Sequence, residues 1–287
     1  MISFIYRIAL LLIVGLAYAA YDLLNKRNVP DIFVYGVFIL GLAITFTYGL
    51  RTIEISLTIS TLIIALGYLI YRKGIMGAGD FMEFATISML LPIQPNPILS
   101  QLPQFGLPFI LSVLISTGYS AIVLTTIYYL GRSFIKGGFR SASPKRRKIY
   151  HGLGLFISYL ILLFLISYLA GFKAFTAVII ITMGAASSLA VIFEKEINMQ
   201  MVSYVYPKDL SKEDMIATNL MPTADLKYFS SKSKHFGRLV TKETLNETKA
   251  IKKKIPVYTS GIPLAFFALI GIIISLLFGN LLIYFII

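Results

Sequence analysis

Long uninterrupted runs of apolar residues constrain this chain more than any other feature. No charged residue occurs between Glu83 and Arg132, and none occurs from Ile255 to Ile287. A helix needs roughly 20 apolar residues to cross about 30 Å of hydrocarbon. The composition agrees, since 57% of the 287 residues are hydrophobic and 14% are charged, with a mean hydropathy of +0.81. We therefore expect an all-α polytopic membrane protein.

Charged residues divide the chain into about eight expected transmembrane helices and one small soluble segment. The expected helices cover residues 3–20, 32–50, 55–71, 80–98, 107–130, 152–170, 173–193 and 261–285. We expect a membrane core of about five helices over 1–131, a basic loop over 132–151, two further helices over 152–193, a soluble segment with the pattern of a small helical subdomain over 194–259, and a C-terminal transmembrane helix over 260–287.

The basic residues gather on alternate connections between these helices. Of the 26 Lys and Arg residues, 23 lie on one side and only Arg7, Arg51 and Lys173 lie on the other. Because Lys and Arg hold flanking loops in the cytoplasm, we expect a multi-pass cell-membrane protein with cytoplasmic basic connections and both termini extracellular. The net charge of +13 then reflects topology, and we expect no nucleic-acid partner. The run 145–148 either only holds its loop inside or also binds anionic membrane lipid.

Few residue types remain that could carry chemistry. The chain has no Cys and two His, so we expect no metal site and no cofactor. Ionisable groups at membrane spans are functional candidates because burying them is costly. Asp22 closes the first span and Asp80 opens the fourth, both on the basic side. Two such carboxylates can share one proton and activate water for attack on a carbonyl, which is the requirement of an aspartyl protease.

Asp80 follows the segment Gly77-Ala78-Gly79, whose glycines permit close approach of backbone or substrate. From Asp80 to the residue before Pro92 the chain has 12 residues, about 18 Å of helix. Either the helix continues past Pro92, or Asp80 starts below the membrane surface in a polar cavity. On the residues alone, Asp22 and Asp80 are also interpretable as interfacial helix caps or as the proton site of a transporter.

Two segments together resemble the type IV prepilin peptidase family, specifically its archaeal preflagellin and prepilin branch. The first is Tyr21-Asp22 followed by Lys26 and Val29-Pro30-Asp31, and the second is Gly77-Ala78-Gly79-Asp80. The resemblance covers roughly the first 92 residues. It implies a GxGD membrane aspartyl protease that removes short basic leader peptides from archaellin or type IV pilin precursors at the cytoplasmic face. It also implies that Asp22 and Asp80 are the catalytic pair and that Gly77 and Gly79 shape the motif.

The chain departs from the family pattern in three ways. Met82 stands where the family usually has Lys, and the family usually has six spans. Bacterial members also methylate the new N-terminus and often carry a cysteine cluster, for which this chain has neither cysteines nor a sufficient loop. We therefore expect cleavage without N-methylation.

Three further residues are candidates for substrate contact. Glu83 lies three residues after Asp80 on the same helical face, and we expect it, with Asp31, to receive the basic residues of the leader. A solvated or capping role for Glu83 is an equal alternative. Lys26, the basic residue of the first motif, is the third candidate.

Two alternatives remain open at this stage. The presenilin and signal peptide peptidase group also pairs Tyr-Asp with Gly-x-Gly-Asp and cuts inside transmembrane helices, but its aspartates lie in later spans. Its late Pro-Ala-Leu motif has Pro263-Leu264-Ala265 as the closest match here. The second alternative is a proton-coupled transporter, which would also use membrane carboxylates.

Overall fold

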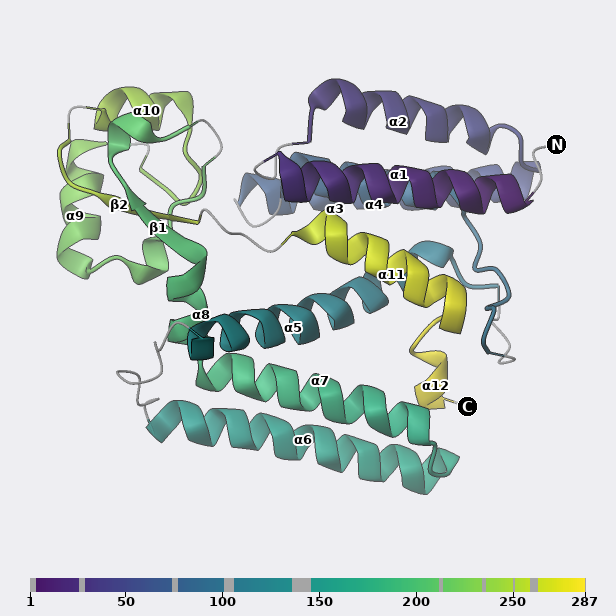
Figure 1. Cartoon of the computed structure of the whole chain (residues 1–287). Coiled ribbons are helices and arrows are strands. Elements are labelled where there is room, and N and C mark those ends of the chain that lie inside the picture. Colours follow the sequence, from purple (N-terminus) through teal and green to yellow (C-terminus); the bar gives the residue numbers. More distant parts are fainter. Residues whose placement is uncertain are drawn as a thin grey trace.

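The computed structural model describes residues 4–25, 29–73, 77–100, 106–135, 146–211, 214–233, 236–249, 251–258 and 263–286. Eight helices run alternately in opposite directions between the two ends of the molecule (Figure 1). They are α1 (Phe4–Leu24), α2 (Asp31–Thr45), α3 (Leu50–Arg72), α4 (Ala78–Leu90), α5 (Phe109–Ile135), α6 (Arg146–Ala170), α7 (Ala174–Ile192) and α11 (Leu264–Phe278).

Five of these helices, α1, α3, α5, α6 and α7, are long and apolar enough to cross a membrane. The other three are shorter than we expected from the sequence, because α2 and α11 have 15 residues each and α4 has 13. The span expected over 80–98 stops at Leu90, since the residue before Pro92 adopts an extended backbone with ψ of 82°. The span expected over 261–285 is interrupted at Gly279, where φ is 78°, and the short helix α12 (Ile283–Ile286) follows.

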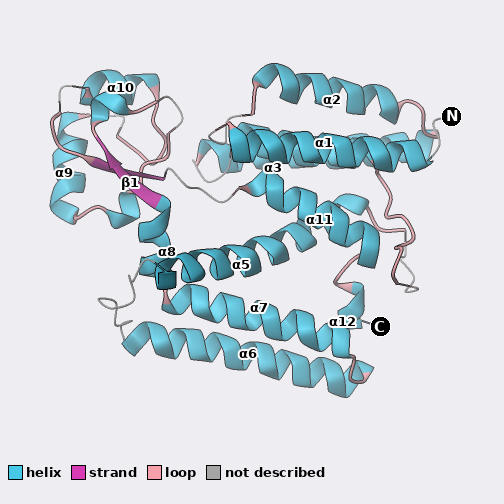
Figure 2. Cartoon of the chain, in the orientation of Figure 1, coloured by secondary structure: helices cyan, strands magenta, loops and turns pink. Residues whose placement is uncertain are grey.

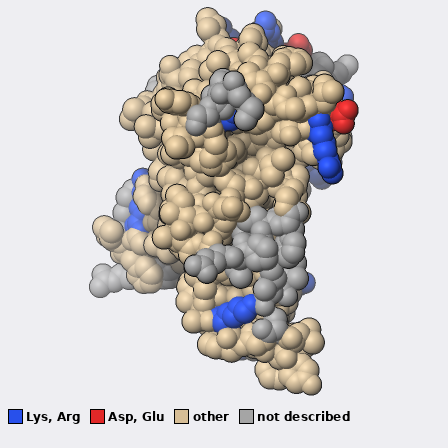
Figure 3. Space-filling model, turned by 90° about the vertical axis from the view of Figure 1, so that its right-hand side faces the viewer, with Lys and Arg blue, Asp and Glu red and all other residues tan. Residues whose placement is uncertain are grey.

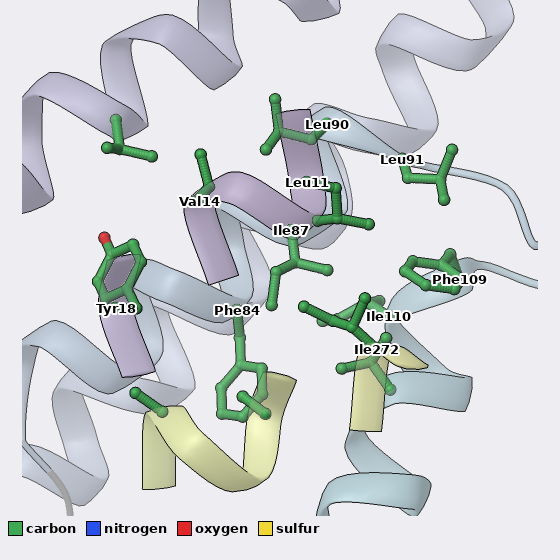
Figure 4. Close-up of a cluster of buried hydrophobic side chains, with 14 of the residues drawn as sticks. Leu11, Val14, Tyr18, Phe84, Ile87, Leu90, Leu91, Phe109, Ile110 and Ile272 are labelled. Carbon is green, nitrogen blue, oxygen red and sulfur yellow. The ribbon is translucent and has the colours of Figure 1, made fainter. Parts of the chain in front are cut away.

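Helix α4 lies at the centre of the helices that the N-terminal half contributes. All but one of its residues from Phe81 to Leu90 are buried. It contacts α1, α2, α3, α5 and α11, and Figure 4 shows Phe84 and Ile87 of α4 reaching a cluster that includes Tyr18 of α1, Ile110 of α5 and Ile272 of α11. Phe84 is 4% exposed and Ile87 1%. Helix α4 is therefore buried on all sides, and its buried polar residues Glu83, Thr86 and Ser88 lie inside the bundle as well.

The contact between α3 and α4 is made by small and hydroxyl-bearing residues. Ser60 and Ser88 share a hydrogen bond of 2.7 Å between their Oγ atoms, and Ser56 donates to the carbonyl of Ser88 at 3.2 Å. A methyl group at Gly67 would overlap the side chain of Phe81. Small residues let two membrane helices approach closely, and their hydroxyls add interhelical hydrogen bonds.

Helix α11 comes from the far end of the sequence but packs against α1 and α5. Its C-terminal carbonyl groups accept hydrogen bonds from the segment that follows α4, through the backbone N–H groups of Ile98 to Leu276 at 3.1 Å and of Leu99 to Leu277 at 2.8 Å. The side chain of Gln94 donates to the carbonyl of Ser275 at 3.0 Å. These bonds satisfy carbonyl groups that a helix end otherwise leaves without partners.

Helices α6 and α7 form a hairpin at the side of the molecule (Figure 1). Nearly all described residues of α6 are exposed or partly exposed in the structure. Much of the surface of this helix is therefore available to lipid. Helix α7 connects to α8 (Glu194–Met201), and the exposed pair Lys148 and Glu194, 2.8 Å apart, joins the start of α6 to the start of α8.

Residues 202–258 form a separate small subdomain at one end of the helices (Figure 2). The helices expected in this segment are present, but strands β1 (Val202–Val205) and β2 (Ile255–Tyr258), which we did not expect, pair antiparallel, with Val202 opposite Tyr258. The two strands come from opposite ends of the segment, so no local sequence pattern predicts their pairing. Helices α9 (Thr223–Lys232) and α10 (Lys242–Thr248) pack with the strands around Phe229, which is fully buried.

The described helix ends fall into two groups. The C-terminal ends of α1, α3, α5 and α7 lie at the end that carries the subdomain, whereas the start of α1 and the C-terminal ends of α2, α4, α6 and α11 lie at the other (Figure 1). Figure 3 views the end with the termini, where charged side chains are sparse among uncharged ones. Which end faces the cytoplasm stays a prediction.

Candidate active site

Asp22 lies in the last turn of α1 and is only 7% exposed. Its Oδ2 atom accepts a hydrogen bond from the backbone N–H of Ala265 in the first turn of α11, at 3.1 Å. Ala265 lies 243 residues after Asp22 in the sequence. Asp22 is therefore not an interfacial side chain in free solvent but part of a contact between two helices.

Asp80 lies in the first turn of α4 and is partly exposed. Its Oδ2 atom accepts a hydrogen bond from the backbone N–H of Gly77 at 2.9 Å. The residue at the N-cap position is Gly77, so the reading of Asp80 as the N-cap itself is wrong, although its carboxylate does satisfy an N–H group at this helix end. A carboxylate here also interacts favourably with the helix dipole.

The two glycines of the motif have different surroundings. A Cβ atom at Gly77 would lie 3.2 Å from Asp80 Oδ2, closer than most real Cβ contacts. A Cβ atom at Gly79 would meet Val29 and Val34 at 3.8 and 3.9 Å, which is ordinary van der Waals contact. The close approach that we expected of these glycines therefore occurs at Gly77 and not at Gly79.

Asp22 near the end of α1, and Asp80 and Glu83 near the start of α4, lie on two helices that contact each other. Helices α1 and α4 pack together, and the last turn of α1 meets the first turn of α4 at the end of the molecule that carries the subdomain (Figure 1). The fold thus brings together two carboxylates that are 58 residues apart in the sequence.

Glu83 is 1% exposed, and its Oε1 atom has no hydrogen-bond partner among the described residues. It lies beyond the first turn of α4, so neither a solvated nor a capping role fits its position. Buried polar atoms without partners are rare, and each calls for an explanation such as a bound molecule. Glu83 is the residue at this site for which a bound molecule is the natural partner.

The other two candidates for substrate contact do not join this group. Asp31 is the first residue of α2 and is exposed. Lys26 lies outside the residues that the structure describes.

Tyr18 is a fourth member of the site that the sequence analysis missed. It is fully buried, its hydroxyl has no hydrogen-bond partner among the described residues, and it lies one helical turn before Asp22 on α1. Its spacing of four residues from Asp22 would have placed both side chains on one face of α1. The segment that contains Ala265 was noted in the sequence, but the hydrogen bond from its backbone N–H to Asp22 was not predicted, because that contact is long-range.

This arrangement supplies the groups for acid and base catalysis on water. Two carboxyl groups from different packed helices each have one oxygen held by a backbone N–H. Carboxyl groups that come close together share one proton, because two like charges cannot both ionise cheaply. Within the described ranges, no group of three His, Cys, Asp or Glu side chains has the arrangement of a metal site.

Comparison with known proteins adds one finding. Residues 9–130 match the model of the type IV leader peptidase family. This region runs from α1 almost to the end of α5 and includes both aspartates, but it excludes α11. No curated protein and no solved structure matches the chain.

Proposed function

We propose that this chain, which over residues 9–130 carries the region typical of the type IV leader peptidase family, is a membrane aspartyl endopeptidase. The family supports a protease of the prepilin type. The observation that carries the aspartyl assignment is the placement of two carboxylates, Asp22 and Asp80, at adjoining ends of the packed helices α1 and α4. Their substrates would be archaellin or pilin precursors with a basic leader peptide.

The two aspartates would act as a pair that holds one proton. The ionised member takes a proton from a water molecule, whose oxygen then attacks the carbonyl carbon of the scissile peptide bond. The protonated member donates its proton to the carbonyl oxygen, and the resulting tetrahedral species collapses as the leaving nitrogen receives a proton. Because the protons belong to the pair, neither role is assigned to one residue.

Glu83 would attract the basic residues of the leader. It adds a third carboxyl to the site, and its Oε1 atom lacks a partner among the described residues. A Lys or Arg side chain of the leader would donate a hydrogen bond to this oxygen atom, and its positive charge would strengthen the bond. Asp31, exposed at the start of α2, and Lys26 would contact the leader nearer the surface.

We propose cleavage without N-methylation of the product. The connection between the described ends of α1 and α2 runs only from Asn25 to Pro30, and the chain has no cysteine. A chain of six residues holds no additional domain in which a methyl-donor site could form.

We also propose that the end with the aspartates faces the cytoplasm and that both termini are extracellular. The connections at this end carry most of the Lys and Arg residues, and such residues hold loops inside. A basic leader peptide would also stay in the cytoplasm, and it would therefore reach the aspartates from this side of the membrane.

One observation keeps a second activity in view. The segment Pro263-Leu264-Ala265, the closest match to the Pro-Ala-Leu motif of presenilin-like proteases, lies directly at Asp22 through the hydrogen bond from Ala265. A presenilin-like enzyme would cut inside the apolar helix of its substrate, whereas a leader peptidase cuts between the basic leader and that helix. The position of the cut separates the two activities.

The test is cleavage of a membrane-embedded precursor that has a basic leader and an apolar helix, with sequencing of the new N-terminus. We expect the wild type to cut at the junction of leader and helix. Asp22→Asn and Asp80→Asn should each lower kcat at least about 1,000-fold, because two catalytic groups that act together lose most of their rate enhancement when either one is removed. Glu54→Gln, at the opposite end of the molecule, is the control and should cut normally. Activity in either aspartate variant would refute the assignment.

A further inference from the structure

The start of α11 touches the proposed catalytic pair directly. Pro263 is the N-cap residue of α11, and Ala265 follows two positions later. The backbone N–H of Ala265 belongs to the first turn, where no carbonyl of the same helix is available to accept it. It donates instead to Asp22 Oδ2 at 3.1 Å, in a buried position.

Helix α11 is held in place by the region that contains the aspartates. Its C-terminal carbonyls accept from the segment after α4, as described above. Along its length it crosses α5 so closely that a methyl group at Gly271 would overlap Thr117, and a Cβ atom at Gly15 of α1 would lie 3.2 Å from Ile272. The position of its first turn is therefore fixed along the helix axis and across it.

The two aspartates are held in matching ways. Asp80 accepts from the N–H of Gly77, within its own segment, whereas Asp22 accepts from α11. In both cases a backbone N–H at the start of a helix donates to one carboxylate oxygen and so restrains the orientation of the carboxylate.

We propose that the first turn of α11 is a positioning element of the active site, in which the Ala265 N–H orients Asp22 toward Asp80. The region that matches the family, residues 9–130, would then be incomplete as an enzyme without a helix that lies more than 130 residues further along the chain. This inference rests on the proposed function, because it assigns a role to α11 in that same reaction.

A proline substitution tests the N–H itself. Ala265→Pro removes this donor in the first helical turn, where proline is better tolerated than in a helix interior, and Ala265→Gly keeps the donor while removing the methyl group. We expect Ala265→Pro to lower kcat by roughly 10-fold to 100-fold, as for loss of a hydrogen bond to a charged group, with an unchanged KM. Ala265→Gly should lose clearly less activity than Ala265→Pro, because it keeps the N–H that donates to Asp22.

These variants separate the inference from the proposed function. If Asp22→Asn is inactive but Ala265→Pro keeps kcat within about threefold of wild type, the positioning role is wrong and the protease remains. If Ala265→Gly loses as much activity as a folded Ala265→Pro, packing rather than the N–H matters, and the inference is also wrong. If the wild type cuts no precursor, the proposed function itself fails.

Cross-linking supplies a second measurement that does not require activity. The chain has no cysteine, so Asp22→Cys with Ala265→Cys introduces one pair only. We expect this pair to form a disulfide in membranes, and the control pair Asp22→Cys with Ser275→Cys, ten residues further along α11, to form none. If Ala265→Pro does not fold, the disulfide is the test that remains. Its formation would support the placement of α11 at Asp22, and failure to form would overturn the inference.

Discussion

At the scale of single residues, the site is unusual in burying a carboxyl group without a partner. Glu83 is 1% exposed, and its Oε1 atom and the Tyr18 hydroxyl both lack hydrogen-bond partners among the described residues. Leaving such atoms unpaired costs about 1–3 kcal/mol each. A bound substrate that forms a hydrogen bond with these atoms would remove this cost. Substrate binding would therefore stabilise the folded protein.

Substitution of Glu83 tests this interpretation. We expect Glu83→Gln to raise KM about 10-fold for a precursor with a basic leader, because a charged hydrogen bond is replaced by a neutral one. A precursor whose leader residues are changed to Gln should show a smaller difference between the two enzymes. Steady-state cleavage of both precursors measures the difference, and equal KM values for wild type and variant on the basic leader would show that Glu83 does not bind it.

The residues of the site differ in how far the sequence could reveal them. Asp22 and Asp80 were predictable because ionisable groups at membrane spans are costly and therefore few. Tyr18 was predictable in principle from its spacing to Asp22. The Ala265 N–H was not, because every residue has a backbone N–H and only the tertiary fold brings this one to Asp22.

At the scale of elements, the helices meet where glycine and serine allow it. The crossing of α5 and α11 depends on Gly271, where a Cβ atom would also come within 2.9 Å of the Thr117 N and Val113 O backbone atoms. Backbone atoms cannot rotate away, so the two helices would have to move apart.

Gly271→Ala should therefore lower the stability of the protein in detergent by about 1–3 kcal/mol, despite the gain of up to about 1 kcal/mol in helix propensity. Gly118→Ala is the matched control on α5, since a Cβ atom there meets nothing within 4 Å. That variant should be as stable as wild type or more stable. Thermal unfolding of the purified variants measures both effects, and a Gly271→Ala variant as stable as Gly118→Ala would contradict the close crossing.

Helix positions were more predictable than helix lengths. The charged residues divide the chain at the correct places, but an apolar run continues through Pro92 and Gly279, where the helices α4 and α11 have already ended. Hydropathy measures the tendency of residues to leave water and does not measure their backbone conformation. It therefore overestimates the length of these helices.

At the scale of the whole molecule, the alternating direction of the helices places the end of α1 with Asp22 and the start of α4 with Asp80 at the end that carries the subdomain (Figure 1). The charge distribution predicts that this end is cytoplasmic, which stays a prediction. It did not predict the antiparallel pairing of β1 and β2, whose partners are separated by the whole subdomain. Long-range pairing of this kind depends on contacts that no local pattern encodes.

Cysteine labelling tests the proposed orientation in the membrane. Glu54 in the first turns of α3 and Glu194 at the start of α8 are both exposed and lie at opposite ends of the molecule. In intact cells, a membrane-impermeant thiol reagent should label Glu54→Cys, and it should label Glu194→Cys only after the membrane is opened. The reverse pattern would place the aspartates outside and remove the cytoplasmic assignment.

The hydrogen bond between Ala265 and Asp22 has a consequence for the time at which the protein becomes active. The two residues are 243 positions apart, and a ribosome that adds about 5–20 residues each second needs roughly 12–50 s to make that length. For most of this interval, after Asp80 has been added, the nascent chain has both aspartates but not the helix that donates to one of them. On the proposed role of α11, the enzyme would have little activity during its own synthesis and would reach full activity only when α11 is in place.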